Sequence, residues 1–178
     1  MHLIFLHGAP GVGKRTIATE LSSELGFPFL NFQLLNSLLG PVFGYTSTSF
    51  GMLRDSMVRQ TIEQSMQLPE NGLIATFNLD QSMPLDDYAT FIAASRESGG
   101  IGLFIGLTCA TEDLKGRAMR SDRGDASGFD VMEGNAANGL PKLPGPSITI
   151  DTTGESPAET VQNIIALLPD DLKANMVF

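Results

Sequence analysis

The feature that most constrains this chain is a glycine-rich segment near its start, which reads Gly8-Ala9-Pro10-Gly11-Val12-Gly13-Lys14-Arg15-Thr16. A short apolar run over residues 2–7 precedes this segment and is typical of a strand. Residues 16–26 follow it with apolar side chains at helical spacing and end on Gly26, so they are predicted to form a helix. A strand, a glycine loop and a helix in this order predict a phosphate-binding site.

The residue types in this loop suit the binding of a polyphosphate. Gly8, Gly11 and Gly13 permit backbone angles and close approaches that a Cβ atom would block, so that successive N–H groups point inward. The helix that starts near Lys14 adds the positive end of its dipole, and the lysine places a point charge on the outer phosphates. The Thr16 hydroxyl is available to a phosphate or to a Mg²⁺ ion. The alternative interpretation is a glycine-rich turn that binds nothing.

One position departs from the commonest form of this motif. Lys14 is followed by Arg15 and not by serine or threonine. A direct hydroxyl ligand for Mg²⁺ is therefore either missing, or supplied by Thr16 or through water.

Composition limits the class of protein. A length of 178 residues, with 42% hydrophobic and 17% charged side chains, predicts one globular domain over residues 1–178. The net charge of −9 argues against a broad nucleic-acid surface, since phosphate contacts need basic patches. Cys109 is the only cysteine, which excludes an intrachain disulfide and fits a reducing, cytoplasmic compartment. The sequence contains no visible signal peptide and no stretch of ~20 apolar residues, so we expect no membrane partner.

Strand and helix patterns alternate along the chain. Strands are predicted at residues 2–7, 27–32, 72–80, 101–109 and 147–151. Helices are predicted at residues 16–26, 33–39, 49–68, 84–98, 111–120 and 156–168, the last with a capping box at its start. This alternation favours a three-layer, doubly wound α/β sandwich with a five-stranded parallel sheet. Residues 121–146 are rich in Gly, Asp, Asn and Pro and are expected to form an extended excursion.

The segment between the second and third predicted strands carries two further expectations. The helix over residues 33–39 is expected to stop at Gly40-Pro41. The helix over residues 49–68 is amphipathic, and its buried face is expected to include Phe50, Leu53 and Met57.

Several polar residues near the predicted strand ends are candidates for chemistry. Asp80 could hold Mg²⁺ through water or accept a proton from an acceptor hydroxyl, and is equally well read as a turn or cap residue. Asn31 and Gln33 follow the second strand at the same edge and could hydrogen-bond an acceptor. Arg54 could clamp an anionic acceptor, although a solvated helix surface is the simpler interpretation. His7, directly before the first glycine, is expected only to pack.

Three arginines fall close together at the end of the predicted helix over residues 111–120: Arg117, Arg120 and Arg123. Cationic groups on a segment that closes over a triphosphate would exclude water and balance charge on the transferring phosphoryl group. The alternative is that these arginines only stabilise the C-terminal end of the helix, where the helix dipole favours positive charge. Residues 120–146 are therefore the predicted lid.

The loop from Gly8 to Thr16 is very similar to that of adenylate kinases, in which the lysine is also followed by a non-hydroxyl residue and then a threonine. Over nearly the whole chain, the order of features resembles small bacterial P-loop proteins of the AAA-family ATPase and shikimate-kinase-like kind. The matching pieces are residues 3–8, the strand before Asp80, residues 107–109 with the following helix, and residues 148–152. This resemblance implies a nucleoside-monophosphate-kinase-like fold with a P-loop, a lid and an acceptor region between strands two and three.

The sequence departs from shikimate kinases at two motifs. Asn31-Phe32-Gln33 stands where an Asp-x-Asp pattern is expected, and the glycine triplet expected after strand three is absent. Shikimate is therefore not the expected acceptor. By analogy of fold, residues 151–154 are expected to lie beside a purine ring.

The resulting hypothesis is an ATP-dependent phosphotransferase that moves the γ-phosphoryl group of Mg-ATP to a small-molecule or nucleotide acceptor. The nucleotide would be held by the loop residues Gly8 to Thr16 and by Arg117. Lys14, Asp80, Arg120 and Arg123 would act in catalysis, and Thr16 with Asp80 would position Mg²⁺. Asn31, Gln33 and Arg54 would meet the acceptor. The alternative is a P-loop nucleotide-binding protein that hydrolyses ATP slowly and serves as a switch or interaction module.

Overall fold

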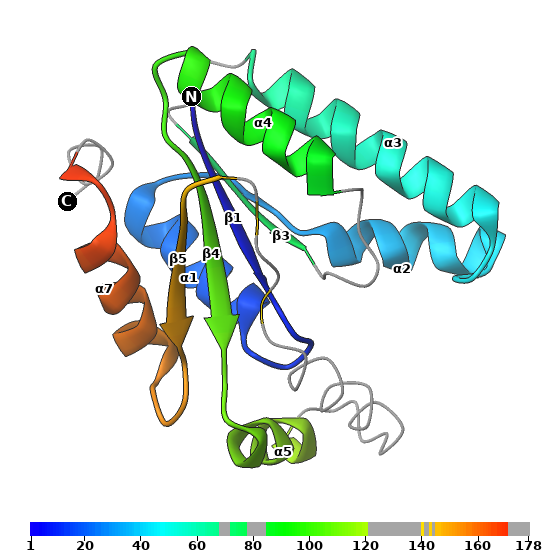
Figure 1. Cartoon of the computed structure of the whole chain (residues 1–178). Coiled ribbons are helices and arrows are strands. Elements are labelled where there is room, and N and C mark those ends of the chain that lie inside the picture. Colours follow the sequence, from blue (N-terminus) through cyan, green and yellow to red (C-terminus); the bar gives the residue numbers. More distant parts are fainter. Residues whose placement is uncertain (68–71, 78–84, 121–139, 141–142, 144, 171–178) are drawn as a thin grey trace.

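A computed structural model describes residues 1–67, 72–77, 85–120, 140, 143 and 145–170 of the chain. Within these residues, five strands form one parallel sheet in the order β2-β3-β1-β4-β5 (Figure 1). The strands are β1 (His2–Gly8), β2 (Phe29–Leu30), β3 (Gly72–Phe77), β4 (Gly102–Thr108) and β5 (Ser147–Asp151). The central strand β1 pairs with β3 and β4, and all three consist almost entirely of buried residues, as parallel strands covered on both faces must.

Helices connect these strands and cover the sheet. They are α1 (Lys14–Leu25), α2 (Phe32–Phe43), α3 (Thr48–Ser65), α4 (Leu85–Glu97), α5 (Thr111–Arg120) and α7 (Pro157–Leu167). The predicted capping box is present at α7, where Ser156 and Glu159 satisfy each other's backbone N–H groups. In the described part of the chain, none of the helices combines the length and the apolar character needed to cross a membrane.

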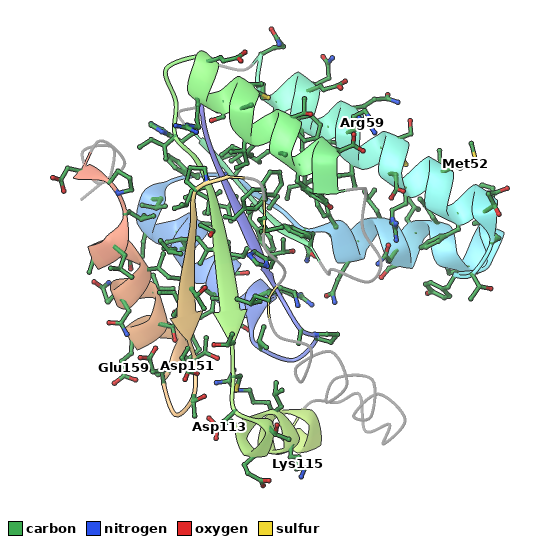
Figure 2. The ribbon with its side chains drawn as sticks, in the orientation of Figure 1. Met52, Arg59, Asp113, Lys115, Asp151 and Glu159 are labelled. Carbon is green, nitrogen blue, oxygen red and sulfur yellow. The ribbon has the colours of Figure 1, made fainter. Side chains whose placement is uncertain are left out.

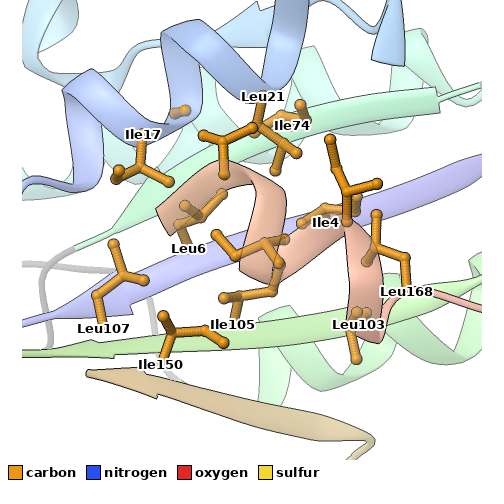
Figure 3. Packing of buried hydrophobic residues seen from close by; sticks show 14 of the residues in the cluster. Ile4, Leu6, Ile17, Leu21, Ile74, Leu103, Ile105, Leu107, Ile150 and Leu168 are labelled. Atoms are coloured by element: carbon orange, nitrogen blue, oxygen red, sulfur yellow. The ribbon is translucent and has the colours of Figure 1, made fainter. Parts of the chain in front are cut away.

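Two hydrophobic cores lie on opposite faces of the sheet. One core packs α1 and α7 against side chains such as Ile4, Leu6 and Ile105 (Figure 3). The other packs α3 and α4 against Leu3, Phe5 and further side chains of the opposite face. The alternation along β1 produces this division, because successive residues of a strand point to opposite faces. The three-layer α/β fold expected from the sequence is confirmed.

Two expectations for the segment after β1 and α1 are wrong. The second strand is only two residues long, and α2 continues through Pro41 to Phe43. A proline inside a helix removes one backbone donor and crowds the carbonyl four residues earlier, and packing can outweigh these costs. Here the ring of Tyr45 lies so close to Gly40 that an added Cβ would be 2.1 Å from it, while Gly44 N donates to Gly40 O at 2.8 Å. These contacts hold the last turn of α2 closed.

The buried face of α3 also differs from the expected one. Phe50 is buried as predicted, but Leu53 is 38% exposed and Val58, which was not on the predicted face, is 3% exposed. The reason is that α3 packs against both α2 and α4, so its contacts do not follow a single helical stripe. Arg59 of α3 and Asp87 of α4 form a bidentate ion pair with N–O distances of 2.9 and 2.6 Å, which joins the two helices.

Candidate functional site

The glycine-rich loop runs from the carboxyl end of β1 into α1, at the edge of the sheet where parallel α/β folds bind ligands. Three of its residues have positive φ angles: Gly8 at 143°, Gly11 at 85° and Gly13 at 99°. A Cβ atom on Gly8 would lie 2.3 Å from the carbonyl oxygen of Leu107 on β4. Glycine is therefore required at Gly8 both by the backbone angle and by the space available.

Lys14, the first residue of α1, turns its side chain back onto the loop. Its Nζ atom donates to Gly8 O at 2.9 Å and to Ala9 O at 2.8 Å. These two carbonyls fix the position of the ammonium group above the loop. A positive charge is thus held in place before any ligand arrives, which lowers the cost of ordering it on binding.

The start of α1 differs from the starts of α2, α3 and α7. Those three helices are capped by the side chains of Asn31, Ser47 and Ser156. The N-cap residue of α1 is Gly13, which has no side chain, and the first turn of α1 contains no acidic residue. The positive end of the α1 dipole therefore faces the loop without a carboxylate of its own first turn to neutralise it, and this favours a bound anion.

Arg117 of α5 contacts the backbone of the glycine loop. Its Nη1 atom donates to Val12 O at 3.1 Å and to Thr152 Oγ1 at 3.0 Å. Its Nη2 atom donates to Thr152 O at 2.6 Å. The guanidinium group thus joins the glycine loop to the connection between β5 and α7. The predicted contact of Arg117 with a nucleotide stays a prediction.

Thr152 is the buried partner in this network, with 2% of its surface exposed. Its backbone N–H donates to Thr108 O at 2.9 Å. Its Oγ1 atom lies within hydrogen-bonding distance of Thr108 O, at 3.0 Å, and of Val12 O, at 3.3 Å. Sequence reasoning singled out residues 151–154 only by analogy of fold, and no sequence pattern identified the pairing of Thr152 with Arg117.

The connection that contains Thr152 is fixed by further hydrogen bonds to α5. Asp151 accepts from the backbone N–H and the hydroxyl of Thr153, at 3.0 and 2.6 Å, and these bonds lower the pKa of its carboxyl group. Thr153 Oγ1 accepts from Ala110 N at 2.8 Å, and Gly154 N donates to Asp113 Oδ2 at 2.6 Å. Asp113 and Asp151 lie near each other beside the sheet edge (Figure 2). Several hydrogen bonds therefore hold the connection between β5 and α7 against the start of α5.

His7 lies directly before Gly8 and packs, as the sequence predicted. It is 2% exposed, with its ring stacked on Phe77 at 5.4 Å and edge-on to Phe104 at 6.2 Å. Its Nδ1 atom is buried and is without a hydrogen-bond partner. Burial, with a smaller contribution from the nearby Lys14 ammonium, lowers the pKa of His7 to about 4. The imidazole is therefore neutral at physiological pH.

The predicted acceptor residues occupy the start of α2 and α3. Asn31 Oδ1 accepts from Gln33 N at 3.1 Å, so Asn31 caps α2 with one of its polar atoms, while the Gln33 side chain is exposed. Arg54 pairs with Asp55 at 2.7 Å and lies over the Phe50 ring at 5.6 Å. Only 12% of the Arg54 side chain is exposed, so it is not the solvated surface residue that the simpler interpretation expected.

Other predicted residues are placed only in part. Thr16 and Arg15 lie in the first turn of α1 and are exposed. Asp80 and Arg123 fall outside the described residues, as do most of the predicted lid and the side chain of Arg120. Across the described residues, no three His, Cys, Asp or Glu side chains gather into a group that could hold a metal ion. The role of Thr16 as a ligand for Mg²⁺ stays a prediction.

No protein-family model matches the chain, and no curated protein matches it in sequence. Solved structures do match it over nearly its whole length. An unliganded sugar kinase from Janibacter sp. HTCC2649 has a TM-score of 0.66 at 16% identity, over 100% of this chain and 99% of that one. A gluconokinase from Sinorhizobium meliloti 1021 has a TM-score of 0.63 at 14% identity, over 93% and 90%. A shikimate kinase from Aquifex aeolicus has a TM-score of 0.55 at 18% identity, over 97% and 97%.

At these identities the likeness establishes the fold. The chain has the fold of P-loop, nucleoside-monophosphate-kinase-like proteins, with a parallel five-stranded sheet and flanking helices. The fold implied by the resemblance in sequence is thereby confirmed.

Proposed function

We propose that this chain is an ATP-dependent phosphotransferase that moves the γ-phosphoryl group of Mg-ATP to a small hydroxyl-bearing acceptor. The observation that carries this proposal is the position of the Lys14 ammonium, which two loop carbonyls hold at the start of a helix whose N-cap residue has no side chain. A fixed cation and the N–H groups of a helix start form a binding site for polyphosphate. The sugar kinase, the gluconokinase and the shikimate kinase that are similar in fold also support this proposal.

In this proposal each part of the site has an electrostatic or positioning role. Lys14 and the loop N–H groups bind the β and γ phosphates and stabilise the charge that spreads over the transferring phosphoryl group. The bond from the γ phosphorus to the bridging oxygen breaks as the bond to the acceptor oxygen forms, and the hydroxyl proton passes to the Asp80 carboxylate. Arg120 and Arg123 add positive charge. A Mg²⁺ ion held through Thr16 and Asp80 would supply further charge neutralisation.

Arg117, which contacts the glycine loop from α5, also has a role in this proposal. Arg117 contacts Val12 O, so it maintains the path of the backbone whose N–H groups meet the phosphates. We propose that Arg117 contributes to nucleotide binding through the shape of the loop.

The acceptor is proposed to bind beside the start of α2. Because Arg54 already has Asp55 as an ion-pair partner, its charge is neutralised and is a weak clamp for an anion. Among the described residues proposed to meet the acceptor, Asn31 and Gln33 then supply the main hydrogen bonds. This favours a neutral polyol or similar alcohol over a phosphorylated acceptor.

The experiment that tests this proposal measures ADP production from Mg-ATP, with and without pooled sugars, polyols, nucleosides and nucleotides. We expect one pool to raise ADP production, and Lys14→Ala to abolish that increase. Lys115→Ala is a matched control, because Lys115 is an exposed lysine of α5 paired with Glu112 at 3.4 Å. Slow ADP production that is equal in every pool would favour the alternative of a slow ATPase or switch. No ADP production with any pool would contradict the proposal.

A further inference from the structure

One arm of the molecule contains no charged residues and many exposed apolar side chains. Residues 25–53, which include β2, α2 and the start of α3, contain no Asp, Glu, Lys, Arg or His, although the chain has a net charge of −9. Among the described residues, eight large hydrophobic side chains are exposed, and seven of them lie on this arm. These seven are Leu34, Leu38, Val42, Phe43, Tyr45, Met52 and Leu53. Such clustering marks an interaction surface.

The centre of this surface is a stripe along α2. Leu34, Leu38 and Val42 follow one another at intervals of four residues, so they share one face of the helix. They are 67%, 62% and 72% exposed, whereas Leu39 and Gly40 on the other side of α2 are buried. In Figure 1, α2 extends away from the sheet towards its turn into α3, and Met52 lies near that turn in Figure 2. The stripe therefore lies on a protruding part of the molecule.

The size of the surface argues against a small ligand. The stripe from Leu34 to Val42 is about 12 Å long at the rise of an α-helix. Each of the seven residues is 38–72% exposed, so together they offer several hundred Å² of surface, comparable with the about 300–600 Å² of the largest apolar patch on a typical monomer. This is of the same order as the about 800 Å² that each partner contributes to a standard protein interface.

We propose that this arm pairs with the same arm of a second copy of the chain, forming a twofold-symmetric dimer. A net charge of −9 makes two copies repel each other over most of their surface, whereas the arm brings no charge to the contact. The stripe is also complementary to itself in an antiparallel helix pair. Leu38 would then meet Leu38 at the twofold axis, and Leu34 would meet Val42 of the second copy.

The first test is the mass of the protein in solution, measured by light scattering at tens of micromolar. We expect the wild type to be a dimer and Leu38→Glu to be a monomer, since two carboxylates would face each other at the axis. Leu167→Glu is the matched control, because Leu167 is 57% exposed on α7, outside the arm. It is expected to stay dimeric. A monomeric wild type, or a Leu38→Glu variant that stays dimeric, would overturn the proposal.

The second test is the register of the two helices. In a Cys109→Ser background, the Leu38→Cys variant is expected to form a disulfide between the two copies of the chain when diamide takes up the two thiol hydrogens. Leu167→Cys is expected to remain reduced under the same conditions. A mixture of Leu34→Cys and Val42→Cys chains is expected to crosslink several times faster than either chain alone. Equal crosslinking at Leu38 and Leu167 would overturn the antiparallel arrangement. Neither test uses a nucleotide, so the outcome is independent of the proposed function.

Discussion

Arg117 Nη2 donates to the carbonyl oxygen of Thr152 at 2.6 Å, and this bond joins helix α5 to the connection between β5 and α7. The same guanidinium group also donates to Val12 O, in the middle of the glycine loop. One side chain therefore ties together three segments that are far apart in the sequence. The shape of the candidate phosphate site therefore depends on Arg117, which the fold brings to the glycine loop from α5.

The first prediction concerns this support. Arg117→Lys keeps the charge but cannot reproduce a planar group with several fixed donors. We expect the variant to lose about 1–2 kcal/mol of unfolding free energy and to bind nucleotide several-fold more weakly. Urea unfolding and a nucleotide-binding titration measure the two effects. Arg96→Lys, at an exposed arginine in the last turn of α4, is the control and is expected to change neither quantity. Unchanged stability and affinity in Arg117→Lys would contradict this role.

The second prediction concerns the path of the loop. Gly8→Ala would place a Cβ atom 2.3 Å from Leu107 O at a residue whose φ angle is +143°. We expect it to destabilise the protein by more than about 2 kcal/mol, or to move the loop and abolish nucleotide binding. Gly51→Ala is the matched control, since Gly51 is inside α3 with nothing within 4 Å of its added Cβ. That control should gain about 0.5–1 kcal/mol, as alanine does in a helix. Thermal or urea unfolding of both variants checks the contrast.

The third prediction concerns pH. The pKa of His7 is about 4 in the folded protein and 6.5 without burial, so the unfolded chain binds more protons between these values. Stability should therefore rise with pH from about 4 to 6.5 and be independent of His7 above that window. His7→Phe removes this term. Between pH 7 and pH 5, we expect the wild type to lose on the order of 1–2 kcal/mol more unfolding free energy than the variant. Equal losses in the two proteins would show that His7 is not buried in its neutral form.

Local patterns allowed much of the fold to be predicted. The glycine loop, α1 and the capping box at Ser156 depend on residues within a few positions of one another, so the sequence contains the whole interaction. The buried strands β1 and β4 are recognisable because their residues are almost all apolar. The layered α/β fold follows from the alternation of such strands with helices.

Long-range packing explains what the sequence did not predict. The continuation of α2 past Pro41 depends on the Tyr45 ring over Gly40, and no helix-breaking rule contains that contact. The grouping of Arg117, Arg120 and Arg123 was visible in the sequence, but the attachment of Arg117 to Val12 and Thr152 requires the sheet to bring these residues together. The exposed stripe on α2 was not predicted, because which face of that helix packs against the rest of the molecule depends on the tertiary structure.

The central claim is that the glycine loop and Lys14 bind the polyphosphate of a nucleotide. The most direct measurement is a calorimetric titration of the wild type, Lys14→Ala and Lys115→Ala with Mg-ATP and with adenosine. We expect the wild type and Lys115→Ala to bind Mg-ATP much more tightly than adenosine. Lys14→Ala is expected to weaken Mg-ATP binding at least about tenfold and to leave adenosine binding unchanged, since a charge-assisted contact is worth about 1.5–3 kcal/mol. Equal affinity of the wild type and Lys14→Ala for Mg-ATP would contradict the account.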